Sequence, residues 1–407
     1  MMHYYHKLIY LLPFALITGP FLPNLIVILC VCFFLIDTFR LKLFDYYKNN
    51  FFKIFLIFLF FINLSSLFSN DLKTFLYTLG YIRYGVFAIF LFYILKNFDK
   101  SKFFLGYTII GVFVLLLIDG FTQFIFGKNL FFFELQMYDS ELSYVTSFFD
   151  DEKKLGSFLS RMLPLLLISF ILIIQKYKKN QFYSAASFIT VLTFILVFLT
   201  TERVAIFIVL IFVLFIFLKS KILFKPKIYF FAVTSFALVI MFYFYPSLLG
   251  KMKSVLYSTG ILFPGYTENG KDVIGGYEIG KFIFSKFHHD QIFGSIDIFK
   301  ENPLFGIGAK NFKYTLIGWH PHNYHAQILS ELGIFSYLTV FLTFVFLIIL
   351  CIKKLFQSFD IKREINFYLI ISFVLSLTPI PSGDFFNSWV NILIFLPVGY
   401  YLYFNEK

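Results

Sequence analysis

The sequence predicts an all-α integral membrane protein with about twelve transmembrane helices. Of its 407 residues, 59% are hydrophobic and 14% are charged. Soluble domains carry about 25% charged residues, so a soluble fold of this length would lack the polar surface to cover its core. A lipid bilayer removes that requirement, because apolar side chains can face the acyl chains. The bilayer is therefore the first expected partner.

Apolar runs recur along the whole chain, and a helical span needs about 20 such residues. The runs lie near residues 8–19, 22–39, 51–69, 79–95, 103–126, 158–175, 182–200, 203–218, 228–245, 325–351, 365–380 and 385–403. The first two are short and are separated by Gly19-Pro20 and Pro23-Asn24. They form either two tilted spans or one broken hairpin.

Cations gather in every second connection between these runs. The basic connections contain Arg40, Lys42, Lys48, Lys96, Lys100, Lys102, Lys176, Lys178, Lys179, Lys219, Lys221, Lys225, Lys227, Lys353, Lys354, Lys362 and Arg363. The positive-inside rule places these loops, and both termini with them, in the cytoplasm. The net charge of +12 is explained by these flanks, so no nucleic-acid partner is expected.

The alternation divides the chain into membrane and external parts. These are the N-terminal membrane helices 1–126, an external loop 127–157, the central membrane helices 158–245, a large external loop 246–324 and the C-terminal membrane helices 325–407. Within the large loop, hydrophobic residues at helical spacing predict a helix near 281–300. That helix either lies on the membrane surface or packs onto the spans, and packing is the favoured interpretation.

The strongest chemical signal is a histidine cluster at the external mouth of the run 325–351. His320, His322 and His325 follow a turn predicted at Gly306-Ile307-Gly308. Histidine is the side chain best suited to proton transfer near neutral pH. The alternatives are interfacial histidines, a metal site with His-x-His-x-x-His spacing, and a catalytic base facing an external cavity. No carboxylate or cysteine cluster supports the metal site, so neither a metal nor another cofactor is predicted.

Two arginines lie at external ends of predicted spans. Arg161 lies about one turn inside a helix that follows the charged segment 150–154, and Arg203 begins the run 203–218. Ionisable residues within spans usually face a cavity or a partner, although snorkelling or pairing with Glu202 or Asp151 is the alternative. Guanidinium groups suit diphosphates because they present paired planar donors. The last external turn, 378–386, is either a tight connection or part of the site.

These residues resemble the bacterial O-antigen ligase and O-antigen polymerase superfamily. The family pattern is His, then Asn, Ser or Gln, nine residues, Gly, two residues, then Gly, Thr or Tyr. Here it reads His322-Asn323, nine residues, Gly333, two residues and Ser336, which departs from the last position. The segment 302–308 and Arg203 also look like the family, although a small residue is commoner there than Glu202. The resemblance covers about 150–400.

The resemblance implies a metal-independent, inverting glycosyltransferase of the bacterial inner membrane. Its substrate would be an undecaprenyl-diphosphate-linked oligosaccharide, and other glycan-assembly proteins are possible partners. His322 is expected to be the base, with Arg161 and Arg203 on the diphosphate. Expected substrate-binding residues are Asn323, His320, His325 and Lys154.

Two further expectations follow from the motif. A small residue at Gly333 is expected to let a neighbouring helix approach closely and so fix the direction of His322. The segments 149–164 and 381–386 look more like repeat-unit polymerases than ligases. An O-antigen polymerase is therefore favoured, a ligase that transfers the glycan to lipid A-core is the first alternative, and a polysaccharide transporter or flippase is the second.

Overall fold

The described part of the chain is mostly helical. The computed structural model describes residues 2–69, 71–139, 142–178, 181–219, 239, 243, 266–268, 271–274, 277–278, 286–315, 317–318, 320–357, 360–380 and 382–406. The strands within these residues are short: β1 (Gln136–Asp139) pairs antiparallel with β2 (Leu142–Tyr144), and β3 (Tyr266–Glu268), β4 (Lys271–Ile274) and β5 (Tyr277–Glu278) form a second antiparallel sheet.

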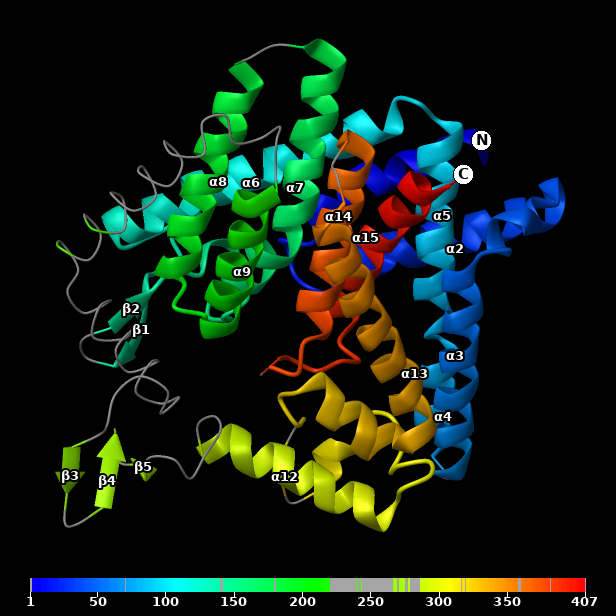
Figure 1. Ribbon diagram of the computed structural model, residues 1–407, viewed down its shortest axis with the longest axis vertical. Coiled ribbons are helices and arrows are strands. Elements are labelled where there is room, and N and C mark those ends of the chain that lie inside the picture. The colour runs from blue at the N-terminus through cyan, green and yellow to red at the C-terminus, as the bar shows by residue number, and fades with distance from the viewer. Residues whose placement is uncertain are drawn as a thin grey trace.

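The helices follow the apolar runs. They are η1 (Met2–Leu11), α1 (Leu12–Ala15), α2 (Phe21–Leu41), η2 (Leu43–Tyr47), α3 (Asn50–Phe68), α4 (Leu72–Leu79), α5 (Ile82–Asn97), α6 (Ser101–Phe126), η3 (Ser147–Phe149), α7 (Leu155–Tyr177), α8 (Gln181–Leu199), α9 (Arg203–Lys219), α12 (Lys286–Glu301), η4 (Phe312–Tyr314), α13 (Tyr324–Leu355), α14 (Ile361–Leu377) and α15 (Ser388–Asn405). Figure 1 shows their arrangement.

Within the described residues, six helical segments are long and apolar enough to cross a membrane. They are α2, α3, α4 with α5, α6, α7 and α13. The all-α membrane class is therefore confirmed, but the count of twelve spans is not. The helices α8, α9, α14 and α15 coincide with predicted runs. Over their described residues, however, they are not among the segments that are both long enough and apolar enough to cross a membrane. The predicted run 228–245 lies almost wholly outside the described residues.

Two predicted spans have a different form from the one expected. The run 8–19 is not a regular span, because it contains the end of the 3-10 helix η1 and the single turn α1, with Pro13 in its first turn. The run 79–95 belongs to a longer segment, 72–97, that breaks between α4 and α5. Asp71 begins this segment by accepting a hydrogen bond from the Lys73 N–H (3.0 Å), which caps α4.

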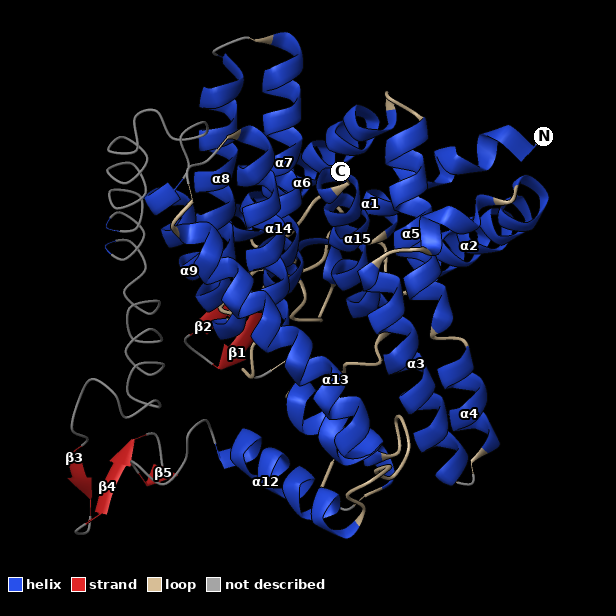
Figure 2. Cartoon of the chain, turned by 45° about the vertical axis from the view of Figure 1, so that its right-hand side comes forward, coloured by secondary structure: helices blue, strands red, loops and turns tan. Residues whose placement is uncertain are grey.

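The described connections of the two sets lie toward opposite ends of the molecule. At one end, Lys96 pairs with Glu406, and Lys362 donates to the Glu406 carbonyl (3.2 Å). At the other end, the Ser382 N–H donates to the His322 carbonyl (2.7 Å). Figures 1 and 2 place both termini toward the upper end and α12 at the lower end. This separation agrees with the alternating loops, while the cytoplasmic assignment of the basic end stays a prediction.

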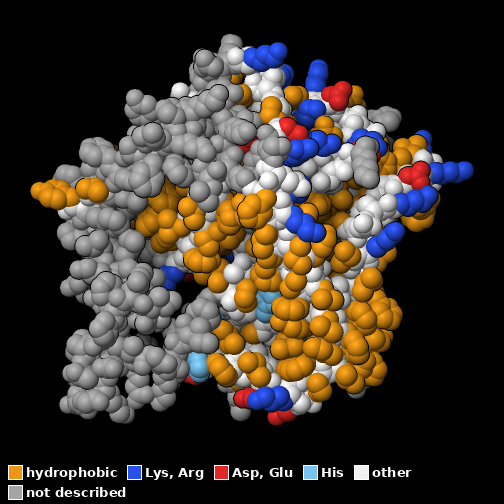
Figure 3. All heavy atoms as spheres, in the orientation of Figure 1, with side chains coloured by type: hydrophobic (Ala, Val, Ile, Leu, Met, Phe, Trp, Pro, Cys, Tyr) orange, Lys and Arg blue, Asp and Glu red, His pale blue; other side chains and the backbone are white. Residues whose placement is uncertain are grey.

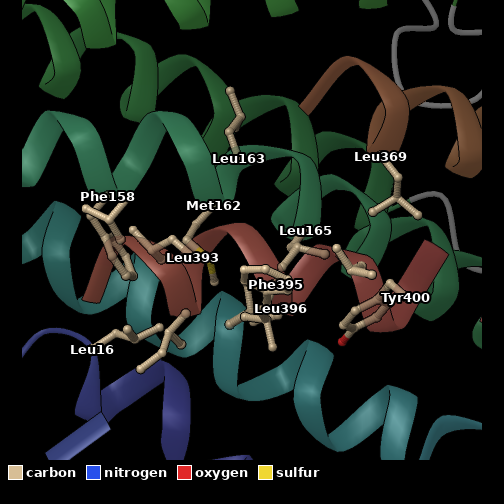
Figure 4. Close-up of a cluster of buried hydrophobic side chains, with 14 of the residues drawn as sticks. Leu16, Phe158, Met162, Leu163, Leu165, Leu369, Leu393, Phe395, Leu396 and Tyr400 are labelled. Carbon is tan, nitrogen blue, oxygen red and sulfur yellow. The ribbon is translucent and has the colours of Figure 1, made fainter. Parts of the chain in front are cut away.

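Burial separates the central helices from the outer ones. Helix α7 is buried along nearly its whole length, as its all-round apolar sequence requires. Figure 4 shows its Phe158, Met162 and Leu165 beside Leu393 and Leu396 of α15. By contrast, Phe60 of α3 and Leu342 of α13 are 62% and 61% exposed. Figure 3 shows a broad hydrophobic band on the visible face, with Lys and Arg side chains gathered above it, as a lipid-facing surface requires.

The predicted helix of the large loop is present as α12. It packs against α13, and its Ile292 and Ile296 are half-buried. This agrees with packing onto the spans, the favoured interpretation. Residues 279–285, which include the start of the predicted helix, lie outside the described residues.

Candidate functional site

The motif His322-Asn323 forms the start of α13. The Asn323 side chain accepts a hydrogen bond from the Ala326 N–H (3.1 Å), which makes Asn323 the N-cap of the helix. His322 has a φ of 50°, in the left-handed region that is uncommon outside glycine. Its carbonyl accepts the Ser382 N–H (2.7 Å), so the last external turn holds this conformation in place. Strained backbone of this kind concentrates at functional sites.

The three clustered histidines have different surroundings. The His320 Nδ1 atom accepts a hydrogen bond from the His322 N–H (3.3 Å), and the two rings lie 3.9 Å apart. His325 is only 8% exposed, and its Nε2 atom lies 2.6 Å from the Leu377 carbonyl oxygen. Its ring packs edge-on against Tyr337 and Phe344. His325 therefore connects α13 with the end of α14, and its contacts differ from those of the other two histidines.

This separation bears on the metal alternative. The Nε2 atom of His325 is engaged by the Leu377 carbonyl, whereas His320 and His322 contact each other. Among the residues that the structure describes, no group of three His, Cys, Asp or Glu side chains has the arrangement of a metal site. The expectation that the reaction needs no metal stays a prediction.

Arg161 lies inside the molecule, on α7 and beside the start of α13. It is 8% exposed, and its Nη1 atom donates a long hydrogen bond to the Ser157 carbonyl (3.4 Å). Its Nε atom is buried and meets no acceptor among the described residues. The guanidinium is close enough for its charge to act on the Tyr324 hydroxyl. That hydroxyl is buried, in the first turn of α13.

Glu202 ties the turn between α8 and α9 to the start of α7. Its carboxylate accepts hydrogen bonds from the Gly156 N–H (2.7 Å), the Ser157 N–H (2.9 Å) and the Ser157 hydroxyl (2.7 Å). Burial raises the pKa of Glu202 to about 7, although these hydrogen bonds and the Arg161 charge oppose the shift. Arg203, the next residue, is exposed. We call Arg161, Glu202 and Arg203 the arginine cluster.

Lys154 lies just before α7. It pairs with Glu152, and its Nζ atom lies 6.0 Å from the centre of the Trp389 ring. Its charge is therefore partly satisfied before any ligand arrives. Among the predicted cations, Arg161 is the one whose charge acts on Tyr324, in the first turn of α13.

A buried polar bridge joins α13 to the turn 378–386. The Gln327 Nε2 atom donates to Asp384 (2.7 Å) and to Glu331 (3.1 Å), and its Oε1 atom accepts the Phe385 N–H (2.7 Å). Glu331 also accepts the Phe312 N–H (3.1 Å), which fixes the segment that leads to the histidines. The sequence alone left the role of the turn 378–386 open, and no motif in it indicated Gln327 or Glu331.

Two cations from distant segments, Lys310 and Arg83, lie close to this bridge. The Nζ atom of Lys310 lies 4.1 Å from the centre of the Tyr77 ring, and the Tyr77 hydroxyl donates to the Phe386 carbonyl. Arg83 donates to the Tyr84 hydroxyl (2.7 Å) and to the Gly80 carbonyl (2.9 Å). Lys310 is within electrostatic reach of both Arg83 and Asp384. We call Tyr77, Arg83, Lys310 and Asp384 the lysine–aspartate cluster.

The sequence contains a signal for Arg83, a member of this cluster, and for its neighbour Glu331. Arg83 and Glu331 are ionisable residues inside predicted spans, and such residues usually mark functional positions. Nothing in the order of residues, however, indicates that α4 and α5 lie beside Lys310.

The glycine of the motif marks a break in α13. Gly333 has φ 74° and ψ −174°, which lies outside any helical conformation. The residues 302–308 fill the break with main-chain hydrogen bonds: Ile307 N–H to Ser330 O (3.1 Å), Gly308 N–H to Glu331 O (2.8 Å) and Ile334 N–H to Pro303 O (2.9 Å). A Cβ atom on Gly333 would lie 2.3 Å from the Leu304 carbonyl oxygen. The expectation that Gly333 admits a neighbouring helix is therefore wrong, because the main chain of a loop lies against it.

No family model matches the chain, and a search of curated proteins finds no match either. The resemblance to the O-antigen ligase and polymerase superfamily therefore rests on the motif residues themselves. The all-α membrane fold, and the meeting of Arg161 with the start of α13, are compatible with that resemblance.

Proposed function

We propose that this protein is a glycosyltransferase that moves an undecaprenyl-diphosphate-linked glycan onto a sugar hydroxyl, and that it polymerises repeat units of a surface polysaccharide. The observation that carries the proposal is the position of Arg161. This buried arginine, with its Nε atom unpartnered among the described residues, lies beside Tyr324, two residues after His322. The proposed base and the proposed diphosphate-binding cation, far apart in sequence, therefore belong to segments that lie side by side.

The proposed chemistry is a single displacement. His322 takes the proton of the acceptor hydroxyl, and that oxygen attacks the anomeric carbon. The new glycosidic C–O bond forms as the bond between the anomeric carbon and the diphosphate oxygen breaks, which inverts the anomeric centre. Undecaprenyl diphosphate leaves with the bonding electrons. Arg161 and Arg203 neutralise its developing charge, the kind of electrostatic stabilisation that typically contributes a few kcal/mol at a pre-organised site.

Deletion of the gene tests the proposal. A polymerase mutant should lose every surface glycan longer than one repeat unit, as seen on a gel. A ligase mutant should lose all glycan from its lipid A-core anchor while lipid-linked polymer accumulates. A flippase mutant should accumulate single lipid-linked repeat units on the cytoplasmic side. A mutant with an unchanged glycan pattern would rule out all three functions in that organism.

Metal dependence can be measured on the purified protein. We expect polymer formation from lipid-linked repeat units to continue in EDTA, because the two arginines supply the positive charge that a divalent cation would otherwise provide. Loss of activity that one divalent cation restores would contradict this expectation.

A further inference from the structure

We propose that the lysine–aspartate cluster binds the acceptor sugar, whose hydroxyl attacks the donor. This inference rests on the proposed function, since it assigns the second substrate of the same reaction. The cluster consists of Tyr77 and Arg83 from the α4–α5 segment, Lys310 from the loop before α13, and Asp384 from the last external turn. It lies outside the arginine cluster and draws on the N-terminal half of the chain.

The cluster places hydrogen-bond donors beside an acceptor. The charges of Asp384, Glu331, Arg83 and Lys313 all act on Lys310. Sugar hydroxyls both donate and accept, so they need donors and acceptors side by side. The cluster offers an ammonium group and a carboxylate together, whereas the carboxylate of Glu202 in the arginine cluster already accepts three hydrogen bonds.

Asp384 is held in place with one oxygen available. Its Oδ1 atom accepts hydrogen bonds from Gln327 (2.7 Å) and from the Phe386 N–H (2.9 Å). Among the described residues, no donor is bonded to its Oδ2 atom, and the side chain is half-buried rather than enclosed. A carboxylate fixed through one oxygen can accept a hydroxyl through the other without reorganising.

The cations are also fixed before any ligand arrives. Lys310 has a φ of 64°, and its ammonium group is held over the Tyr77 ring. The Arg83 Nε atom is buried and has no acceptor in the described part of the chain. Burial lowers the pKa of Lys310, while Asp384 and Glu331 oppose the shift. These are donors on rigid supports, as a recognition site for hydroxyl groups requires.

The location fits an acceptor. Ser382, two residues before Asp384, donates its N–H to the His322 carbonyl (2.7 Å), so the last turn lies directly against the proposed base. The Tyr324 hydroxyl is within electrostatic reach of both Arg161 and Asp384. The two clusters therefore meet at the first turn of α13. A sugar held by Lys310 and Asp384 would therefore lie beside the turn that contacts His322.

Binding of two separate probes to the purified full-length protein tests this assignment. The probes are undecaprenyl diphosphate without sugar and the lipid-free repeat-unit oligosaccharide. We expect Lys310→Met and Asp384→Asn each to weaken oligosaccharide binding about tenfold or more, because each removes a charged hydrogen-bonding group. Undecaprenyl diphosphate should bind both variants as it binds the wild type. That unchanged binding also shows that the variants are folded. Lys313→Met, an exposed cation on η4 beside Lys310, is the matched control.

Three other outcomes would overturn the assignment. Wild-type affinity of both variants for the oligosaccharide would remove the cluster from the acceptor site. Loss of undecaprenyl diphosphate binding in a variant that elutes as wild type on size exclusion would assign the cluster to the donor instead. Failure of the wild type to bind either probe, together with an unchanged glycan in the deletion strain, would refute the proposed function itself and the inference with it.

Discussion

The arginine cluster and the lysine–aspartate cluster meet at the same helix start but differ in origin and in the acceptor that each offers. In the first, the Glu202 carboxylate already accepts three hydrogen bonds from Gly156 and Ser157, which leaves the two arginines as its binding groups. In the second, Asp384 is bonded through Oδ1 alone among the described residues and lies within electrostatic reach of Lys310. Cations suit a phosphate, and donors beside an acceptor suit hydroxyl groups. We therefore expect the two clusters to bind different substrates.

The largest expected effect comes from disrupting α13, the helix at whose start the two clusters meet. Gly333→Ala should abolish binding at both, because the new Cβ atom would meet the Leu304 carbonyl and the backbone conformation is one that only glycine adopts readily. We expect a loss of about 3 kcal/mol or more in the free energy of unfolding. Thermal stability in detergent measures it. Gly111→Ala is the control, because its Cβ would lie 3.6 Å from the Phe14 ring, an ordinary contact. Equal stability of the two variants would contradict the role given to the break.

The next effect separates chemistry from binding. His322→Ala should lower the rate of polymer formation about a hundred- to ten-thousandfold, the usual consequence of removing a general base. Both probes should still bind, because neither cluster includes this side chain. His325→Ala should act differently, since it leaves a cavity among Tyr337 and Phe344 and removes the contact with Leu377. We expect it to lower the melting temperature more than the rate per folded molecule. Full activity of His322→Ala would show that the base is another group.

The third effect concerns the inside and the edge of the arginine cluster. Arg161→Ala should weaken undecaprenyl diphosphate binding more than Arg203→Ala, because Arg161 is buried with an unpartnered Nε atom and Arg203 is exposed. Arg161→Lys should also be impaired, since an ammonium group cannot make paired hydrogen bonds. Arg363→Ala, at the opposite end of the molecule, serves as the control. Equal affinities for all these variants would show that the cluster supplies only diffuse charge.

The smallest effect is a pH dependence confined to the arginine cluster. The pKa of Glu202 in the folded protein lies above its ordinary value of 4.5. The stability that the protonated group contributes is therefore complete below pH 4.5 and is lost as the pH rises through about 7. We expect the melting temperature of the wild type to fall by about 2–4 °C relative to Glu202→Gln between pH 5 and pH 8. Parallel curves for the two proteins would show that Glu202 does not titrate in this range.

Part of this arrangement could be predicted without a structure. The membrane class, most helix positions and the separation of the loops into two ends follow from hydropathy and charge, which are properties of short stretches of chain. The starts of α7 and α9 also agree with the places expected for Arg161 and Arg203. The His322-Asn323 pair could be identified as the beginning of a helix because a capping residue acts on its own first turn.

The tertiary structure decided what depends on contacts between distant segments. The sequence places Gly333 inside an apolar run. Only the fold shows that residues 302–308 lie against it and form hydrogen bonds with the main-chain groups that the break in α13 leaves free. Likewise, His325 looks like a member of the histidine cluster until its contact with Leu377 is seen. Arg83, Lys310 and Asp384 come from three separate parts of the chain. Their meeting was set by helix packing, because long-range packing reflects the fit of whole helices and leaves no periodic signal in any one of them.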